Sequence, residues 1–216
     1  MKKRILGRRS EALGRIAVSL AIILLANLVF GVFYIFPIQA VRVEEQHAGL
    51  FHTQVIHREW APARREGVYL TANRWGVQAS VVTWNLGWHA AGAALDCSGG
   101  KLLYMGEFTF HDACRSASHE FFGRLGSWDI KRLEIRVTYT ATKEGTRQNV
   151  GTCLLEVNED DFIEWNDERY FLVRHFTPQG AERAIYGAEV TAYNARNEAI
   201  LQQEVECILS TTRFCA

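Results

Sequence analysis

The chain has 216 residues, of which 48% are hydrophobic and 22% charged, and it contains 24 basic and 24 acidic residues. This composition excludes an intrinsically disordered or collagen-like protein, and the length indicates one domain with additional segments. The formal net charge of zero combines two unlike segments: residues 1–36 carry a charge of +5 and residues 37–216 a charge of −5. An acidic outer part disfavours binding to nucleic acid or other polyanions.

An uncharged run of 21 residues, 16–36, follows the basic N-terminal segment 1–15. At about 1.5 Å per residue, a helix of this length spans roughly 30 Å, the thickness of a bilayer's hydrocarbon core. Basic residues precede the run, and Glu44 and Glu45 follow it. The positive-inside rule therefore predicts a cytoplasmic N-terminus, a single transmembrane helix and an extracytoplasmic remainder.

Two export signals compete with an uncleaved signal anchor. A cleaved signal peptide would end at Ala40, but residues 16–36 are longer than its apolar region requires, and bulky Ile38 stands where a small residue is preferred. Arg8 and Arg9 form a twin-arginine pair, but polar residues follow it where apolar ones are expected. We therefore expect an anchor that stays attached.

Residues 37–60 are expected to connect the membrane segment to the domain. Their apolar residues fit a strand and a helix equally well, so both remain open. His47, His52 and His57 recur every five residues, a spacing that gathers them on one face of neither a helix nor a strand. We expect solvated positions here and no metal site.

From residue 61 onward the pattern is typical of β-strands joined by short turns. The clearest strand is 131–140, where one face is apolar and the other polar, and a turn at 143–146 leads into a returning strand. Gly106 interrupts another apolar run and predicts a bulge. Further strands are expected at 67–72, 77–86, 102–110, 162–165, 170–176, 189–193 and 199–209.

One short helix is expected at 116–124, with Ser116 as its N-cap. The strand spacing and short turns predict a mainly-β fold, an antiparallel sandwich-like extracytoplasmic domain over residues 61–216. A domain of this size buries a normal core without disulfides or metal ions.

All five cysteines lie in the outer part of the chain, where disulfides can form. Cys97 and Cys114 flank the strand at 102–110 and are the favoured pair. Cys153 and Cys207 fall on apolar faces of predicted strands, either paired across sheets or as plain buried thiols. Cys215, next to last, is expected to be unpaired or to tether another chain.

A nucleophilic site needs a base close to its nucleophile. Cys114 and His119 form the sharpest such pair in the sequence, with His111 and Asp112 close by. The competing interpretation is a polar loop that carries a disulfide cysteine. No motif indicates a cofactor, so none is expected.

Aromatic residues offer a platform for a ligand such as a sugar. Trp75, Trp84 and Trp88 cluster within 14 residues, and an uninterrupted strand would place Trp84 and Trp88 on one face. A turn at 85–87 is equally compatible, and aromatic residues in β-domains usually fill the core.

These observations favour a single-pass membrane protein whose outer domain is a non-catalytic binding or assembly module of the cell envelope. The bilayer around residues 16–36 and an envelope protein are its expected partners. One alternative is an envelope enzyme that uses the loop from His111 to His119. Another is an accessory subunit of a membrane complex, in which Asn27 and Gly31 pack the helix against a partner.

Overall fold

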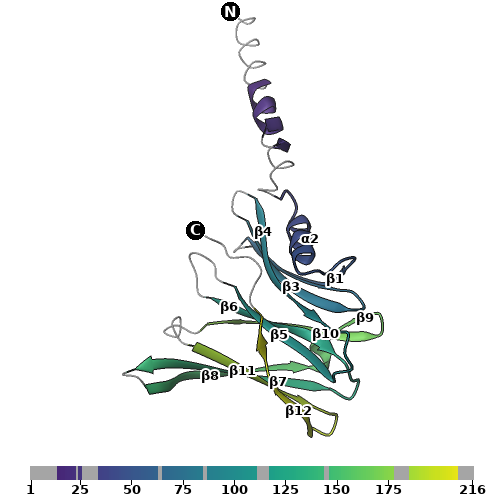
Figure 1. Ribbon diagram of the computed structural model, residues 1–216, viewed down its shortest axis with the longest axis vertical. Helices are drawn as coiled ribbons and strands as arrows, with labels where there is room; N and C mark the ends of the chain where they lie inside the picture. The colour runs from purple at the N-terminus through teal and green to yellow at the C-terminus, as the bar shows by residue number, and fades with distance from the viewer. Residues whose placement is uncertain are drawn as a thin grey trace, which may run out of the picture.

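A computed structural model describes residues 14–22, 24–25, 34–62, 65–84, 87–110, 117–143, 146–177 and 185–208. Within these ranges the chain is mainly β, as expected, and its strands form three sheets (Figure 1). Every strand pair is antiparallel except one short parallel pair. Residues 14–22 and 24–25 are helical. Among the described residues, no helix combines the length and the apolar character needed to cross a bilayer.

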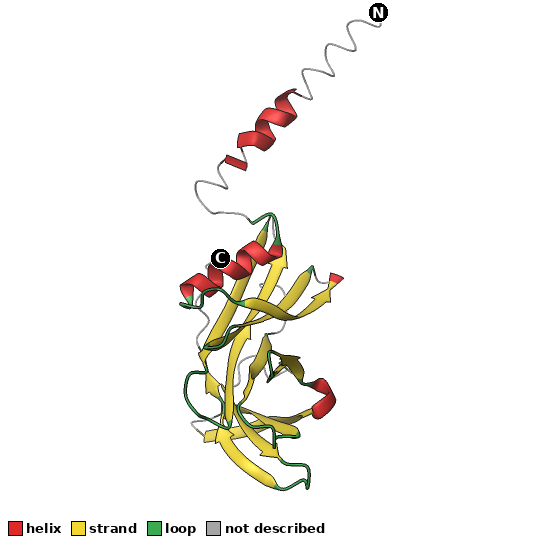
Figure 2. Cartoon of the chain, turned by 90° about the vertical axis from the view of Figure 1, so that its right-hand side faces the viewer, coloured by secondary structure: helices red, strands yellow, loops and turns green. Residues whose placement is uncertain are grey.

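The first sheet has the order β1-β2-β3-β4 and carries the only α-helix that packs on a sheet within the described residues. That helix lies across the face of the sheet turned away from the other two sheets (Figure 2). Ala40 and Val41 of the helix are buried against Tyr69, Val82 and Ala90. The elements are α2 (Pro37–His47), β1 (Gln54–Ala61), β2 (Glu66–Ala72), β3 (Gly76–Trp84) and β4 (Trp88–Asp96).

The central sheet has the order β13-β5-β6-β10-β9. Apolar clusters cover both of its faces: Phe108 and Phe122 pack toward the first sheet, whereas Phe121 and Phe171 pack toward the third. Strands β5 and β6 therefore have almost no solvent-facing side, whereas β13 at the edge is exposed. The strands of this sheet are β5 (Leu103–Phe110), β6 (Ser118–Leu125), β9 (Ile163–Trp165), β10 (Glu168–Phe176) and β13 (Glu206–Cys207).

The third sheet has the order β12-β11-β7-β8 and packs on the central sheet. Its strands are β7 (Arg132–Lys143), β8 (Thr146–Asn158), β11 (Ile185–Tyr193) and β12 (Ala199–Glu204), and the 3-10 helix η2 (Glu159–Asp161) follows β8. The predicted alternation in β7 is confirmed, because its four apolar side chains are buried on one face; they are Leu133, Ile135, Val137 and Tyr139.

Three sequence expectations about elements are wrong. The helix expected at 116–124 is the strand β6, and the strand expected at 199–209 is divided after Glu204, so that β12 and β13 belong to different sheets. Gly106 is not at a bulge, since the pairing of β5 with β6 runs through it without a shift. Instead, the Ile208 side chain occupies the space that a Cβ at Gly106 would need.

The segment expected as a connector, 37–60, holds α2 and most of β1, so the helix and the strand that the pattern left open both occur there. Strand β4 was not expected. Its sequence is rich in alanine and glycine, residues with low strand propensity, and these small side chains let the backbone of β3 approach closely. A Cβ at Gly92 would lie 2.6 Å from the carbonyl oxygen of Ala79.

Candidate functional site

His119, a candidate from the sequence, is buried in β6 on the face of the central sheet that packs against the third sheet. It pairs across the strands with Thr109 of β5 and His175 of β10. The sequence predicts a helix here, with Ser116 as its N-cap. The alternation typical of a strand is missing because both faces of this central strand are buried, so each face carries apolar and partnered polar residues.

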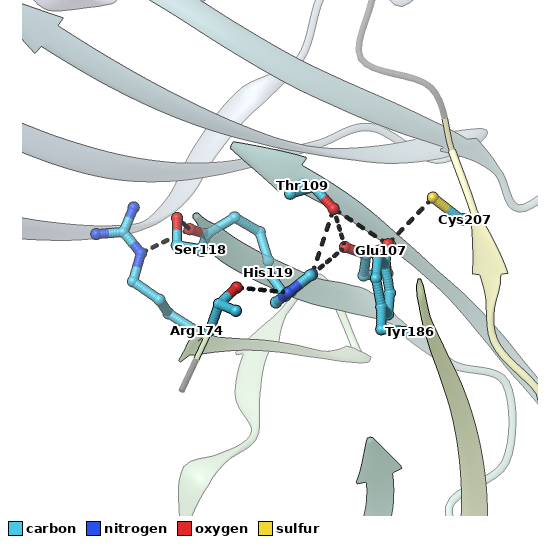
Figure 3. Close-up of polar contacts among 9 residues, drawn as sticks. Glu107, Thr109, Ser118, His119, Arg174, Tyr186 and Cys207 are labelled. Carbon is cyan, nitrogen blue, oxygen red and sulfur yellow. Dashed lines mark hydrogen bonds and ion pairs between the residues drawn. The ribbon is translucent and has the colours of Figure 1, made fainter. Parts of the chain in front are cut away.

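Glu107 and Thr177 lie on either side of the His119 ring. The Nδ1 atom of His119 is 3.1 Å from Glu107 Oε1 (Figure 3). Its Nε2 atom is 3.1 Å from Thr177 Oγ1. An ionised carboxylate only accepts hydrogen bonds, so Nδ1 donates to Glu107, and in the neutral ring Nε2 accepts from the Thr177 hydroxyl. The fold thus connects a carboxylate, an imidazole and a hydroxyl by two consecutive hydrogen bonds.

Tyr186 of β11 closes this group from the third sheet. Its hydroxyl donates to Glu107 Oε2 and lies 3.1 Å from Thr109 Oγ1 and 3.2 Å from Cys207 Sγ (Figure 3). Burial raises the pKa of Tyr186, and the hydrogen bonds to Cys207 and Glu107 raise it further. We call these six residues the His119 cluster: Glu107, Thr109, His119, Thr177, Tyr186 and Cys207.

The thiol of the cluster is a weaker acid than a free cysteine. Cys207 is exposed as a residue, but partial desolvation of its thiol raises its pKa, although the hydrogen bond with Tyr186 lowers it. A thiol must lose its proton to act as a nucleophile or a metal ligand. Cys207 is therefore a poor nucleophile at neutral pH, and the stronger chemistry of the cluster lies in Glu107, His119 and Thr177.

A second buried ionic group lies on the opposite face of the central sheet. Arg174 of β10 donates from Nε to Glu120 Oε1 at 2.6 Å and also pairs with Glu66 of β2. Ser118 donates to the same Glu120 oxygen at 2.9 Å. The pKa of Glu120 is raised to about 7, because the effect of burial outweighs the lowering effects of Arg174 and Ser118. This group joins the first sheet to the central sheet by an ion pair.

The other catalytic candidates, His111, Asp112 and Cys114, fall in residues 111–116, outside the described residues. The structure therefore does not test a pair between Cys114 and His119. Cys114, the favoured disulfide partner of Cys97, thus also lies outside the described residues, and Cys97 itself is a free thiol.

Three cysteines lie within the described residues, and all three are free thiols: Cys97, Cys153 and Cys207. Cys97 is buried, and burial raises its pKa to about 11. Cys153 lies 3.9 Å from His175 Nδ1, whereas Cys207 contacts Tyr186. No disulfide therefore occurs within the described part of the chain, and Cys153 and Cys207 are not bonded to each other.

The structure brings together two of the three candidate tryptophans. Trp84 ends β3 and Trp88 begins β4; the two residues pair across the hairpin, with ring centroids 5.3 Å apart. Trp60 of β1, which was not a candidate, lies equally close to Trp88. Trp75 lies before β3, at the opposite end of that strand, and stacks with Arg74. The three predicted residues do not form one platform.

Strand β8 forms one edge of the third sheet and is 13 residues long. The segment 148–155 within it contains no charged residue. Val150 and Leu154 expose 50% and 47% of their surface, and Val150 is the extra residue where the pairing with β7 shifts. A long edge strand with exposed apolar side chains and few charges is a common site of strand addition by another chain.

Sequence reasoning missed Glu107, Thr177 and Tyr186. Glu107 did carry a signal, because it is the single charged residue in the apolar run 102–110. A charged residue inside a buried strand needs a partner. Thr177 and Tyr186 carried no such signal. Thr177 approaches His119 because β10 pairs with β6, and Tyr186 approaches it because the third sheet packs on the central sheet.

No protein family model, curated protein or solved structure matches this chain. Function therefore has to be inferred from the chain's own residues. Within the described residues, no group of three or more His, Cys, Asp or Glu side chains is placed to hold a metal ion.

Proposed function

We propose that this protein is a single-pass membrane protein whose sandwich-like β-domain lies outside the cytoplasm and binds a partner protein of the cell envelope. In this proposal the domain is a non-catalytic binding or assembly module, and residues 16–36 anchor it. The observation that carries the binding role is the long, weakly charged edge of β8.

The anchor is supported by exposed apolar side chains. Six large apolar residues of the N-terminal helical residues are more than half exposed: Ile16, Val18, Leu20, Ile22, Leu24 and Leu25. Side chains of this kind on all sides of a helix require an apolar surrounding, which lipid supplies. The +5 charge of residues 1–36 supports the cytoplasmic side for the N-terminus.

The edge of β8 supports binding by strand addition. Its neighbour β7 occupies one side, and the sheet order places no described strand on the other. A partner strand would gain main-chain hydrogen bonds along Gly151–Leu155, and Leu154 would contribute an apolar contact. The bulge at Val150 bends the strand, which limits pairing to the segment that follows it.

Site-specific photo-crosslinking in native membranes tests the binding role. A photoreactive amino acid at Leu154 of the full chain is expected to give one dominant protein adduct. The same amino acid at Gln202 is the matched control, because Gln202 lies exposed on β12, the opposite edge of the same sheet. Equal adducts at both positions, or none at Leu154, would contradict the proposal.

A charge at the edge gives a second test. Leu154→Lys is expected to abolish the adduct formed by a photoreactive residue at Thr152, because an edge lysine blocks strand addition. Gln202→Lys adds the same charge beside Glu189 and is expected to leave the adduct unchanged. Thermal unfolding of both variants shows whether the domain remains folded.

A second candidate function, hydrolysis, is favoured by one observation. The order carboxylate, imidazole, hydroxyl in Glu107, His119 and Thr177 is the order of a catalytic triad. Here Thr177 would be the nucleophile, His119 the base, and Glu107 would orient the ring. Thr177 is buried and lies beside the end of β10, so a substrate would have to reach it from that end of the central sheet.

A fluorophosphonate probe tests this second function. The Thr177 oxygen would bond to phosphorus, fluoride would leave, and His119 would take the hydroxyl proton. Labelling of the wild type that persists in Thr177→Ser and disappears in Thr177→Val would support hydrolysis. An unlabelled wild type, or labelling that survives in Thr177→Val, would contradict it.

A further inference from the structure

Aromatic and apolar side chains gather at one end of the first sheet. Trp60 and Trp84 each pack against Trp88 there, one with its ring tilted and one edge-on, on the face that carries α2. Trp60 and Trp84 expose 45% and 42% of their surface. We call these three residues the tryptophan tip. Tryptophans packed together yet open to solvent form an amphipathic surface, with indole N–H groups among apolar rings.

The tryptophan tip is joined to the place where the chain enters the domain. The backbone N–H of Trp88 donates to the carbonyl oxygen of Tyr34 at 3.0 Å, and the two residues form an isolated β-bridge. Tyr34 lies within the uncharged run 16–36. The next residues, Ile35 and Phe36, are more than half exposed before α2 begins. The end of the uncharged run and the tip therefore form one continuous surface.

Basic residues border this surface. Arg65 is exposed in the turn between β1 and β2, and its carbonyl oxygen accepts a hydrogen bond from the backbone N–H of Trp84. Arg58 is exposed on β1, two residues before Trp60 and thus on the same side of the strand. Tryptophan and tyrosine concentrate where a bilayer meets water, and arginine there contacts lipid phosphates.

We propose that the tryptophan tip inserts into the headgroup layer of the same membrane that residues 16–36 enter, and so fixes the domain against the bilayer. This inference rests on the proposed anchor. The tryptophan tip contacts lipid in this proposal because it adjoins the end of the membrane segment. A helix that enters the bilayer at Tyr34 leaves the neighbouring side chains within reach of the headgroups. The first sheet is also the part of the domain nearest the N-terminal helix in both views (Figures 1 and 2).

The chain offers an internal control at the other end of the domain. Trp75 and Trp128 expose 55% and 56% of their surface, slightly more than the tip residues. Trp75 precedes the nine-residue strand that ends in Trp84, so the two lie roughly 30 Å apart along β3. Arg124, near the end of β6, reaches the backbone of Arg74, which places Trp128 at the same far end. These two tryptophans should stay in water.

Fluorescence quenching of the full-length protein in lipid vesicles tests the proposal. The vesicles contain phosphatidylcholine and phosphatidylglycerol with a nitroxide quencher on the headgroup. One variant, Trp75→Phe with Trp128→Phe, keeps the tip; the other, with Trp60, Trp84 and Trp88 each changed to Phe, keeps the far end. Trp165 is present in both. Headgroup quenching is expected to be at least about threefold stronger in the first variant.

The same experiment separates this inference from the proposed anchor. Flotation of the vesicles shows whether the protein is bound at all. Protein that floats and shows equal quenching in both variants would overturn the tip inference and leave the anchor intact. Protein that does not float would overturn the anchor and the tip with it. If the triple variant does not fold, single changes decide: Trp84→Phe should lower the quenched fraction and Trp75→Phe should raise it, and any other result overturns the tip.

Discussion

Tyr186 is the residue that completes the hydrogen bonding of Glu107. Its hydroxyl reaches Glu107 Oε2 from the third sheet, while His119 and Thr109 serve Oε1. Glu107 is fully buried, and a buried carboxylate oxygen that loses its donor keeps its desolvation cost. The central and third sheets are therefore joined by a polar contact as well as by apolar packing.

Tyr186→Phe is expected to lower the free energy of unfolding by about 1–3 kcal/mol, because it leaves Glu107 Oε2 without its donor. Urea unfolding in detergent, followed by tryptophan fluorescence, measures the change. Tyr193→Phe is the control on the same strand, since that ring lies on the outer face beside Arg132, and should change stability by less than about 0.5 kcal/mol. Equal effects of the two changes would contradict this role of Tyr186.

Glu120 makes the stability of the domain depend on pH. Burial raises its pKa from an ordinary 4.5 to about 7. The folded protein therefore keeps a proton on Glu120 that the unfolded chain releases, so this contribution to stability is present below pH 4.5 and is lost as the pH rises to about 7.

Glu120→Gln is expected to remove this pH dependence. Between pH 4.5 and 7, the free energy of unfolding of the wild type should fall relative to the variant by at most about 3 kcal/mol. Unfolding of both proteins at a series of pH values measures the difference. Glu164→Gln, which changes an exposed carboxylate, should run parallel to the wild type. A wild type that gains stability relative to Glu120→Gln over this range would contradict the raised pKa.

At the scale of elements, β6 depends on a glycine. A Cβ at Gly123 would lie 2.0 Å from the carbonyl oxygen of Tyr104 and 2.8 Å from the Phe171 ring. Gly123→Ala is therefore expected to destabilise the fold by about 3 kcal/mol or more, as overpacking against backbone cannot relax easily. Gly187→Ala in β11 is the matched control, because nothing lies within 4 Å of its Cβ position. A smaller loss of thermal stability in Gly123→Ala than in Gly187→Ala would contradict this packing.

The sequence predicts strands well where one face of the strand is exposed to solvent and the other is buried. Strands β7 and β8 alternate apolar and polar residues, and the short hairpin from β9 to β10 shows its turn at Asn166 and Asp167, both with positive φ. The alternation of apolar and polar residues is lost in strands whose two faces are both buried. In β6, Glu120 faces the first sheet and His119 the third, so no alternation marks it as a strand. Strand β4 lacks the β-branched residues that usually indicate a strand.

The candidate site was predictable only in part, for a related reason. His119 stood out in the sequence, but its partners lie in β5, directly after β10 and in β11, which meet through long-range strand pairing and sheet packing. Trp84 and Trp88 meet because a hairpin joins them, whereas Trp75 lies at the other end of the same strand. Residue type and spacing can indicate a local pair, but not a group assembled from several strands of two sheets.

At the scale of the molecule, the equal numbers of basic and acidic residues describe two different segments. Residues 1–36 carry +5 and residues 37–216 carry −5. In the proposed arrangement the basic segment stays in the cytoplasm, the uncharged run crosses the bilayer, and the tryptophan tip contacts the outer headgroups. The edge of β8 belongs to the third sheet, which the central sheet separates from the first. In this arrangement the edge therefore lies away from the lipid, where the proposed partner can reach it.

Protease protection in sealed, right-side-out membrane vesicles, combined with alkaline extraction, tests the proposed anchoring most directly. The full chain, tagged at its N-terminus, is expected to stay in the membrane pellet at alkaline pH. External protease should remove the β-domain and leave a short protected fragment that carries the tag. A chain that begins at Tyr34 should appear in the soluble fraction. Release of the full chain at alkaline pH, or a β-domain protected until the vesicles are lysed, would contradict the proposed anchoring.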